Sequence, residues 1–183
     1  MKTNTKLFAV TFILLALFIC SNVKAQSVAE GKFRFGIGVD GLLPVGDFHN
    51  AVNFGLGVTP RLQYGIANNV GLTFTSGFYH FFTKPLYIPA GFLGAGERIE
   101  NHLDIVPVKI GIKAFVTSSI YLSAEAGAGF EVEDGGGPTK LIASPSVGYA
   151  SKRWDVSVRY EDFIGQSNNY GVLGLRIAYG FGL

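Results

Sequence analysis

The sequence has 183 residues, 48% of them hydrophobic and 15% charged, with one cysteine and a formal net charge of +2. Soluble domains carry about 25% charged residues, so this composition does not indicate a protein whose whole surface is exposed to water. The basic excess lies at the start, because losing Lys2, Lys6 and Lys24 lowers Lys+Arg from 15 to 12 against 13 acids. That balance gives no case for nucleic-acid binding.

Residues 1–25 have the pattern of a secretory signal peptide. Two lysines precede an apolar run at 7–20, and a short polar stretch ends at Ala25, after which we expect cleavage. The run is shorter than the roughly 20 residues of a membrane-spanning helix, which disfavours an anchor. Acylation of Cys20 is an alternative that the bulky preceding residue disfavours. Residues 26–183 are predicted to form one domain without disulfides or thiol chemistry.

Beyond the leader, apolar residues recur at every second position. In GKFRFGIGVDG, residues 31–41, phenylalanine, isoleucine and valine alternate with arginine, glycine and aspartate. Successive side chains of a strand point to opposite faces, so such alternation predicts strands with one apolar face. The pattern predicts strands near 32–42, 52–64, 70–82, 104–116, 120–131, 139–150, 153–162 and 170–182.

Short and long connections alternate between these strands. Tight turns are predicted at 65–69, 117–119 and 151–152, and longer links rich in Gly, Asp or Asn at 43–51, 83–101, 132–138 and 163–169. Strands of about ten residues joined in this way are typical of small membrane barrels. The predicted fold is all-β: an eight-stranded antiparallel up-and-down transmembrane β-barrel occupying residues 26–183.

Alternation alone leaves open which face points outward. A soluble lipocalin-type barrel would place the apolar series inside, around a ligand, whereas a membrane barrel reverses the two faces. The polar series consists mostly of small residues with charges of both signs, which suits a narrow interior filled by side chains. Facing lipid, each basic residue would cost ~2–4 kcal/mol at the midplane. We therefore predict a lumen charge network of Arg34, Asp40, Arg61, Lys109, Lys113, Glu125, Asp155, Arg159, Glu161 and Arg176.

The apolar series would then face lipid; in the second strand it comprises Val52, Phe54, Leu56, Val58, Leu62 and Tyr64. Large aromatic residues gather at the ends of this face, as in interfacial girdles. Near the turn end they are Phe33, Tyr64, Tyr149, Trp154 and Phe181, and near the loop end Phe54, Phe78, Phe130 and Tyr160.

Two local features lead to sharper expectations. Pro60, Pro107 and Pro145 fall inside predicted strands, where proline removes a ladder hydrogen bond, so we expect breaks or bulges there. A hairpin turning at 117–119 places Glu125 opposite Gly111, with Lys109 and Lys113 as diagonal neighbours on the same face. Glu125 is expected to be buried and paired with one or both lysines.

Over residues 31–183 the chain resembles the eight-stranded outer-membrane β-barrel family of Gram-negative envelopes, including the PorT-like barrels. The resemblance rests on GKFRFGIGVDGLLPVGDF, the turn GIANNVGL and the closing YGVLGLRIAYGFGL. It implies export to the outer membrane, folding by the barrel-assembly machinery and contact with outer-membrane lipid. Members of such families include passive anchors, adhesins, secretion accessories and a few enzymes.

The polar residues of the rim form no recognised catalytic or metal motif. His49, His80 and His102 lie at the loop end without HxxxH or HExxH spacing. Ser167, His102 and Asp162 lack a GxSxG or other hydrolase motif. Glu131, Glu133 and Asp134 would at most hold a divalent cation weakly. We expect no catalytic residue, cofactor or metal, and no nucleic acid.

The segment 83–101, TKPLYIPAGFLGAGERIEN, carries unusually many apolar residues for an outer loop. They are Leu86, Tyr87, Ile88, Phe92 and Leu93, which either form a binding surface or fold over the barrel rim. The expected protein is a monomeric, non-enzymatic outer-membrane barrel with a plugged polar lumen, whose long loops bind or shield an external protein or ligand. The alternatives are an outer-membrane enzyme or secretion component on the same scaffold, and a secreted lipocalin-like barrel.

Overall fold

The computed structural model describes residues 28–84, 86–88, 97–99, 102–132, 137–165 and 169–182. For 86–88, 97–99 and 182 only the backbone is described. The predicted signal peptide, residues 1–25, lies outside the described residues.

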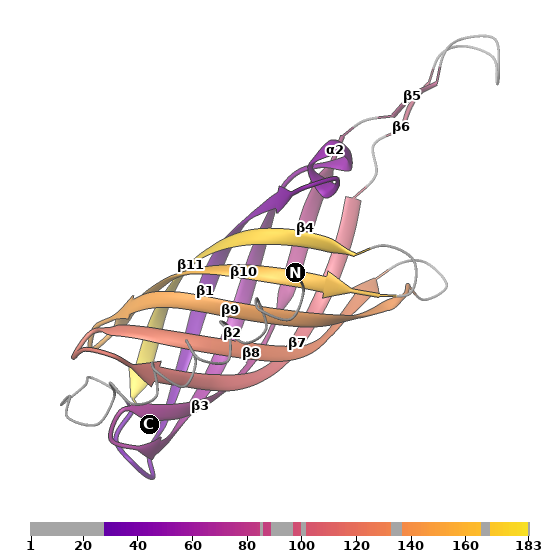
Figure 1. Cartoon of the computed structure of the whole chain (residues 1–183). Coiled ribbons are helices and arrows are strands. Elements are labelled where there is room, and N and C mark those ends of the chain that lie inside the picture. Colours follow the sequence, from indigo (N-terminus) through magenta and orange to yellow (C-terminus); the bar gives the residue numbers. More distant parts are fainter. Residues whose placement is uncertain are drawn as a thin grey trace, which may run out of the picture.

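The described chain forms an antiparallel sheet that closes on itself (Figure 1). β1 pairs with both β2 and β11, and the other barrel strands follow in chain order, whereas β5 and β6 form a separate two-stranded sheet. The elements are β1 (Phe33–Val45), α2 (Phe48–Ala51), β2 (Val52–Ala67), β3 (Val70–Ser76), β4 (Phe78–Thr83), β5 (Leu86–Ile88), β6 (Glu97–Ile99), β7 (His102–Phe115), β8 (Ile120–Val132), β9 (Thr139–Ala150), β10 (Trp154–Ile164) and β11 (Tyr170–Gly182).

The barrel has eight strand positions because β3 and β4 are two parts of one strand. Both lie between β2 and β7, and their registers with β2 and with β7 are the same on either side of Gly77. The predicted eight-stranded antiparallel barrel is therefore confirmed. Among the described residues, no helix has the length and hydropathy of a membrane-spanning helix.

The in-strand prolines lie where strand pairing is interrupted. The constant register places Pro60 of β2 and Pro107 of β7 across from the break at Ser76 and Gly77. Pairing of β9 with β10 likewise skips the positions around Pro145 without a shift of register. These are breaks and not bulges, because a residue without an N–H leaves a ladder bond unmade but inserts no extra residue.

Gly77 suits the break that it occupies. Its φ of 155° is a conformation that other residues rarely adopt. A Cβ there would lie 2.1 Å from the carbonyl oxygen of Val58 on the neighbouring strand. The close approach of β2 to this point thus requires glycine.

The apolar face of the barrel points outward and the polar face inward. Ile110 and Val39 are 63% and 60% exposed, whereas Lys109 and Arg176 are each 1% exposed. This orientation is opposite to that of a lipocalin-type barrel, which would line its interior with the apolar series. The described structure therefore contradicts the secreted lipocalin-like alternative.

Val52 is an exception to the predicted alternation. It was expected on the outer face with Phe54, but it is buried at 2% exposure in the interior. The register of β2 against β4 shifts between Val52 and Phe54, and the additional residue rotates Val52 to the other face. A local bulge of this kind leaves no signal in the apolar pattern.

Aromatic residues flank the outer apolar face at both barrel ends. At the turn end the Phe33 and Tyr64 rings lie 4.7 Å apart, and Trp154 packs edge-on against Tyr179. At the loop end Phe54 stacks on Phe82 at 4.7 Å. Of the nine predicted girdle residues, all but the half-buried Tyr64 are exposed: Phe33, Phe54, Phe78, Phe130, Tyr149, Trp154, Tyr160 and Phe181.

The interior is layered along the barrel axis. Its loop-end half holds an apolar cluster of Leu42, Val52, Tyr79, Phe81, Ile105, Ile142, Phe163 and Val172. Phe48 of the short helix α2 packs against this cluster from the loop end. The part toward the turns holds charged and hydroxyl side chains together with a smaller cluster of Phe115, Tyr121 and Ala150. The β5–β6 hairpin extends beyond the loop end (Figure 1).

Candidate functional site

The ten charged residues predicted for the lumen are all buried inside the barrel. They come from β1, β2, β7, β8, β10 and β11, and each lies at one of the alternate positions of its strand whose side chains point inward. We call this set the interior network.

Each carboxylate of the interior network has a basic partner. Asp40 accepts a hydrogen bond from Arg159 at 2.6 Å, and Glu125 accepts one from Arg61 at 3.1 Å. The other pairs join Lys109 to Glu161 and Lys113 to Asp155. Because an unpaired charge in such an interior is costly, this pairing is what makes the buried charges tolerable.

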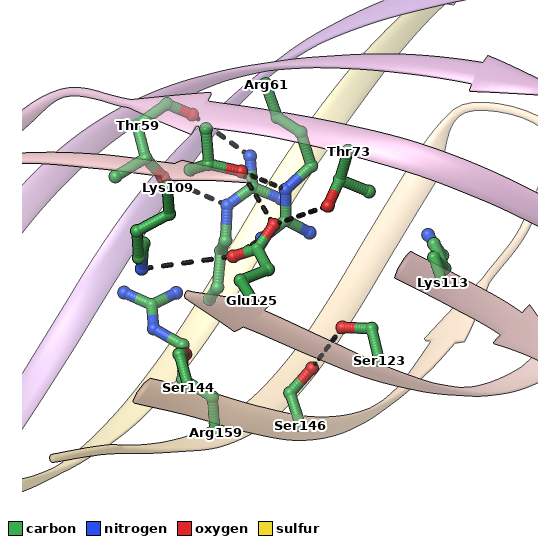
Figure 2. A network of polar contacts seen from close by, with 12 residues as sticks. Thr59, Arg61, Thr73, Lys109, Lys113, Ser123, Glu125, Ser144, Ser146 and Arg159 are labelled. Carbon is green, nitrogen blue, oxygen red and sulfur yellow. Dashed lines mark hydrogen bonds and ion pairs between the residues drawn. The ribbon is translucent and has the colours of Figure 1, made fainter. Parts of the chain in front are cut away.

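Glu125 lies opposite Gly111, as the hairpin geometry predicted. Its closest basic partner is Arg61 of β2, with Lys109 farther away at 3.9 Å (Figure 2). Thr73 and Thr75 also donate to its Oε1, at 2.9 and 2.8 Å.

Of the two lysines predicted as partners of Glu125, Lys109 approaches it and Lys113 does not. Lys113 pairs instead with Asp155, which also accepts a hydrogen bond from the Tyr121 hydroxyl at 2.6 Å. The cause is the narrow interior, in which side chains from opposite walls meet as readily as those from adjacent strands.

A second group of contacts in the network is built around Tyr79, a residue that was not predicted from the sequence. Its hydroxyl lies 2.9 Å from Arg159 Nη2 and 3.1 Å from Lys109 Nζ, both of which donate to it. Glu161 receives hydrogen bonds from Ser144 and from Tyr79, both at 3.3 Å. Tyr79 is two residues from Phe81 on β4, and both side chains point inward. The alternation along this strand could have indicated the inward position of Tyr79.

Inward glycines provide the space for long side chains from neighbouring strands. A Cβ at Gly38 would lie 2.6 Å from the guanidinium carbon of Arg176, and one at Gly57 would lie 2.5 Å from the ring of Tyr79. Gly148 is covered in the same way by Tyr121. At Gly57 and Gly148 the covering group is a rigid ring, so interior packing favours glycine at these two positions.

A cavity of about 510 Å³ opens at the loop end, above the apolar cluster. Its wall includes Phe48 and Tyr170, whose rings stack 4.1 Å apart, and Tyr170 also stacks on Phe163. The Tyr170 hydroxyl donates to Glu131 at 3.1 Å, and the Lys140 ammonium lies 5.2 Å from the Tyr170 ring. This size and mixture of aromatic and polar groups are typical of small-molecule sites.

The predicted loop surface is described only in part. Leu86, Tyr87 and Ile88 form β5, which pairs with β6, and their side chains lie outside the described structure. Phe92 and Leu93 lie outside the described residues altogether. Whether these residues form a binding surface stays a prediction.

Rim residues discounted for catalysis show no catalytic arrangement in the described part. His80 Nδ1 lies 2.5 Å from Asp104 Oδ1, and His102 Nε2 lies 3.6 Å from Asp104 Oδ2. No group of three or more His, Cys, Asp or Glu side chains among the described residues is placed to hold a metal ion. Ser167, Glu133 and Asp134 lie outside the described residues.

No protein-family model and no curated protein matches the chain. Its structure is similar to that of Ail, the attachment invasion locus protein of Yersinia pestis. Ail in complex with the heparin analogue sucrose octasulfate matches with a TM-score of 0.57 and 15% identity, over 83% of this chain and 99% of that one. The backbone structure of Ail in a phospholipid bilayer nanodisc matches with a TM-score of 0.55 and 16% identity, over 83% of this chain and 100% of that one. The likeness shows the fold, which is that of an outer-membrane β-barrel.

Proposed function

We propose that this chain is a non-enzymatic integral outer-membrane β-barrel whose loop end binds an external partner. The observation that carries the proposal is the combination of an apolar outer face with an interior of paired charges. In water the outer face would expose a large apolar surface, whereas in a bilayer the same face meets lipid and the aromatic ends meet the headgroups.

Export and family are part of the same proposal. A signal peptide at residues 1–25 would deliver the chain to the periplasm, from which the assembly machinery would insert the barrel. Membership of the PorT-like barrels rests on the sequence resemblance alone. We also expect the barrel to act as a monomer.

The loop-end cavity supports binding at this end of the molecule and not through the barrel. Below it, the apolar cluster and the interior network fill the lumen, so a solute would meet packed side chains. A cavity of about 510 Å³ with aromatic walls is within the range of small-molecule sites.

The chemistry of the loop end differs from what a polyanion requires. Among the described side chains at this end, acidic residues outnumber basic ones: Asp47, Asp104, Glu131 and Asp162 against Lys84 and Lys140. Like charges disfavour association. The sulfated ligand named for Ail is therefore not proposed for this chain.

Membrane fractionation tests the proposal. The full chain expressed in a Gram-negative host should appear in the outer membrane, shortened by its leader, and require detergent for extraction. Boiled and unboiled samples should migrate differently on a gel, because closed barrels resist detergent unfolding. Recovery of the mature protein from the periplasm without detergent would contradict the proposal.

Planar-bilayer recording tests the filled interior. Purified protein should give no steady conductance, since paired buried side chains occupy the lumen from the apolar cluster to the turns. A large, stable conductance would show that the interior opens.

A further inference from the structure

The interior network carries more positive than negative charge. Its described members comprise six basic residues and four acidic ones, all at or below 9% exposure. Each carboxylate is engaged by Arg61, Arg159, Lys109 or Lys113 at hydrogen-bond distance. Two guanidinium groups, those of Arg34 and Arg176, have no carboxylate at hydrogen-bond distance among the described residues, and the nearest one to Arg176 is Asp40 at 3.9 Å.

The hydrogen bonds of these two arginines all go to neutral groups. Arg176 donates to the Thr59 hydroxyl and carbonyl at 2.9 and 3.0 Å, and it approaches Asp40 only to 3.9 Å. Arg34 donates to the carbonyl oxygens of Ser151 and Lys152, at 3.4 and 3.1 Å for Nη2. Hydrogen bonds of this kind orient a guanidinium without neutralising it, and Asp40, which Arg159 already engages at 2.6 Å, offsets only part of the Arg176 charge.

Both arginines lie over the same seam between β1 and β11. The Arg176 guanidinium lies over Gly38, and that of Arg34 lies over Gly180. In the register of this pair, Gly180 faces Gly36, which is two residues from Gly38. Two residues along a strand correspond to about 7 Å, so the two positive groups occupy neighbouring inward positions.

A small cavity lies at this place. Its volume is about 10 Å³, and its wall includes Arg34, Arg176, Gln63, Gly36 and Gly180. Such a volume corresponds to about one water-sized particle. Asp155 also lines it, but this carboxylate is already held by Lys113 and by the Tyr121 hydroxyl.

We propose that this cavity is a binding site for one small inorganic anion of the halide class, held between Arg34 and Arg176 with Gln63 at its side. A halide ion between the two guanidinium groups would compensate two neighbouring positive charges. A water molecule in the same cavity would leave the repulsion between these charges in place. Sulfate, phosphate and organic anions are too large for the cavity.

The site is independent of the proposed binding at the loop end. It lies near the turn end, beside the carbonyls of residues 151 and 152 that Arg34 contacts. An anion there would stabilise the folded barrel by mass action, since the unfolded chain has no such site. Failure of this inference would leave the membrane proposal intact.

Halide-dependent unfolding provides the first test. Refolded protein in detergent micelles is unfolded with urea at constant ionic strength while chloride replaces gluconate. The urea midpoint should rise and saturate with chloride, and bromide should act alike. Arg176→Met should remove this dependence, whereas Arg153→Met, which changes an exposed arginine near the same end, should keep it. Equal midpoints of the unaltered protein in chloride and gluconate would overturn the proposal.

Crystals grown in bromide provide a second test that needs no variant to fold. The proposal expects an anomalous peak in the cavity between Arg34 and Arg176. Water density there without an anomalous signal would overturn it.

Discussion

At the scale of single residues, Glu125 of β8 meets Arg61 of β2, although β7 and β3 lie between these two strands in the sheet. Side chains two residues apart on a strand point to the same face, and this rule predicted that Lys109, Lys113 and Glu125 all point inward. The pairing of Glu125 with Arg61 was not predictable, because β2 and β8 are not adjacent and only closure of the barrel brings them together.

Glu125→Ala should lower the free energy of unfolding by about 3–5 kcal/mol, because it leaves Arg61 and Lys109 buried beside an empty acceptor position. Urea titration of refolded protein in micelles, followed by tryptophan fluorescence, measures the change. Asp47→Ala is the control, since Asp47 is exposed. Equal midpoints for the two variants would contradict the role given to Glu125.

Gly57→Ala should also be destabilising, by about 1–3 kcal/mol, because the added methyl group would lie against the Tyr79 ring. Gly41→Ala is a matched control, because a Cβ at Gly41 meets nothing within 4 Å. The same unfolding titration compares them. If Gly41→Ala lowered the urea midpoint as much as Gly57→Ala, the cost would not come from packing against the Tyr79 ring.

At the scale of elements, the strands and their order follow from the period of two, and the structure has them within a few residues of the predicted bounds. The prolines correctly marked interrupted pairing. The bulge that turns Val52 inward was missed because a single inserted residue leaves the pattern almost unchanged. The inward apolar cluster was also missed, although Ile105 and Ile142 share the parity of buried polar residues on their strands.

Replacing residues 85–101 with a short Gly/Ser link should leave folding intact. β4 and β7 already pair with each other up to Phe82 and His102, so the segment adds nothing to their ladder. The heat-dependent gel shift and the urea midpoint of the shortened protein should match those of the full chain. Loss of the gel shift would show that the segment is part of the barrel. If binding resides in this segment, an external partner of the full chain should no longer bind.

At the scale of the whole molecule, the chemistry of the two faces of the sheet indicates what surrounds the barrel. The outer surface presents side chains such as Ile110, Ile112 and Leu175 at 63%, 51% and 48% exposure, while paired charges fill the interior. Composition alone indicated a surface that is only partly exposed to water. Because β1 pairs with both β2 and β11, the described strands of the barrel have no open edge, and it is the outer apolar face that would contact lipid.

Quenching of tryptophan fluorescence by brominated lipids tests this assignment most directly. The chain has one tryptophan, Trp154, exposed at the turn end of the outer face, and Ile110 lies near the middle of β7 on the same face. In bilayers, lipids brominated near the headgroup should quench Trp154. In a Trp154→Phe background, the Ile110→Trp variant should be quenched most by bromines deep in the acyl chains. Absence of quenching at both positions, in protein shown to be folded, would contradict a lipid-facing outer surface.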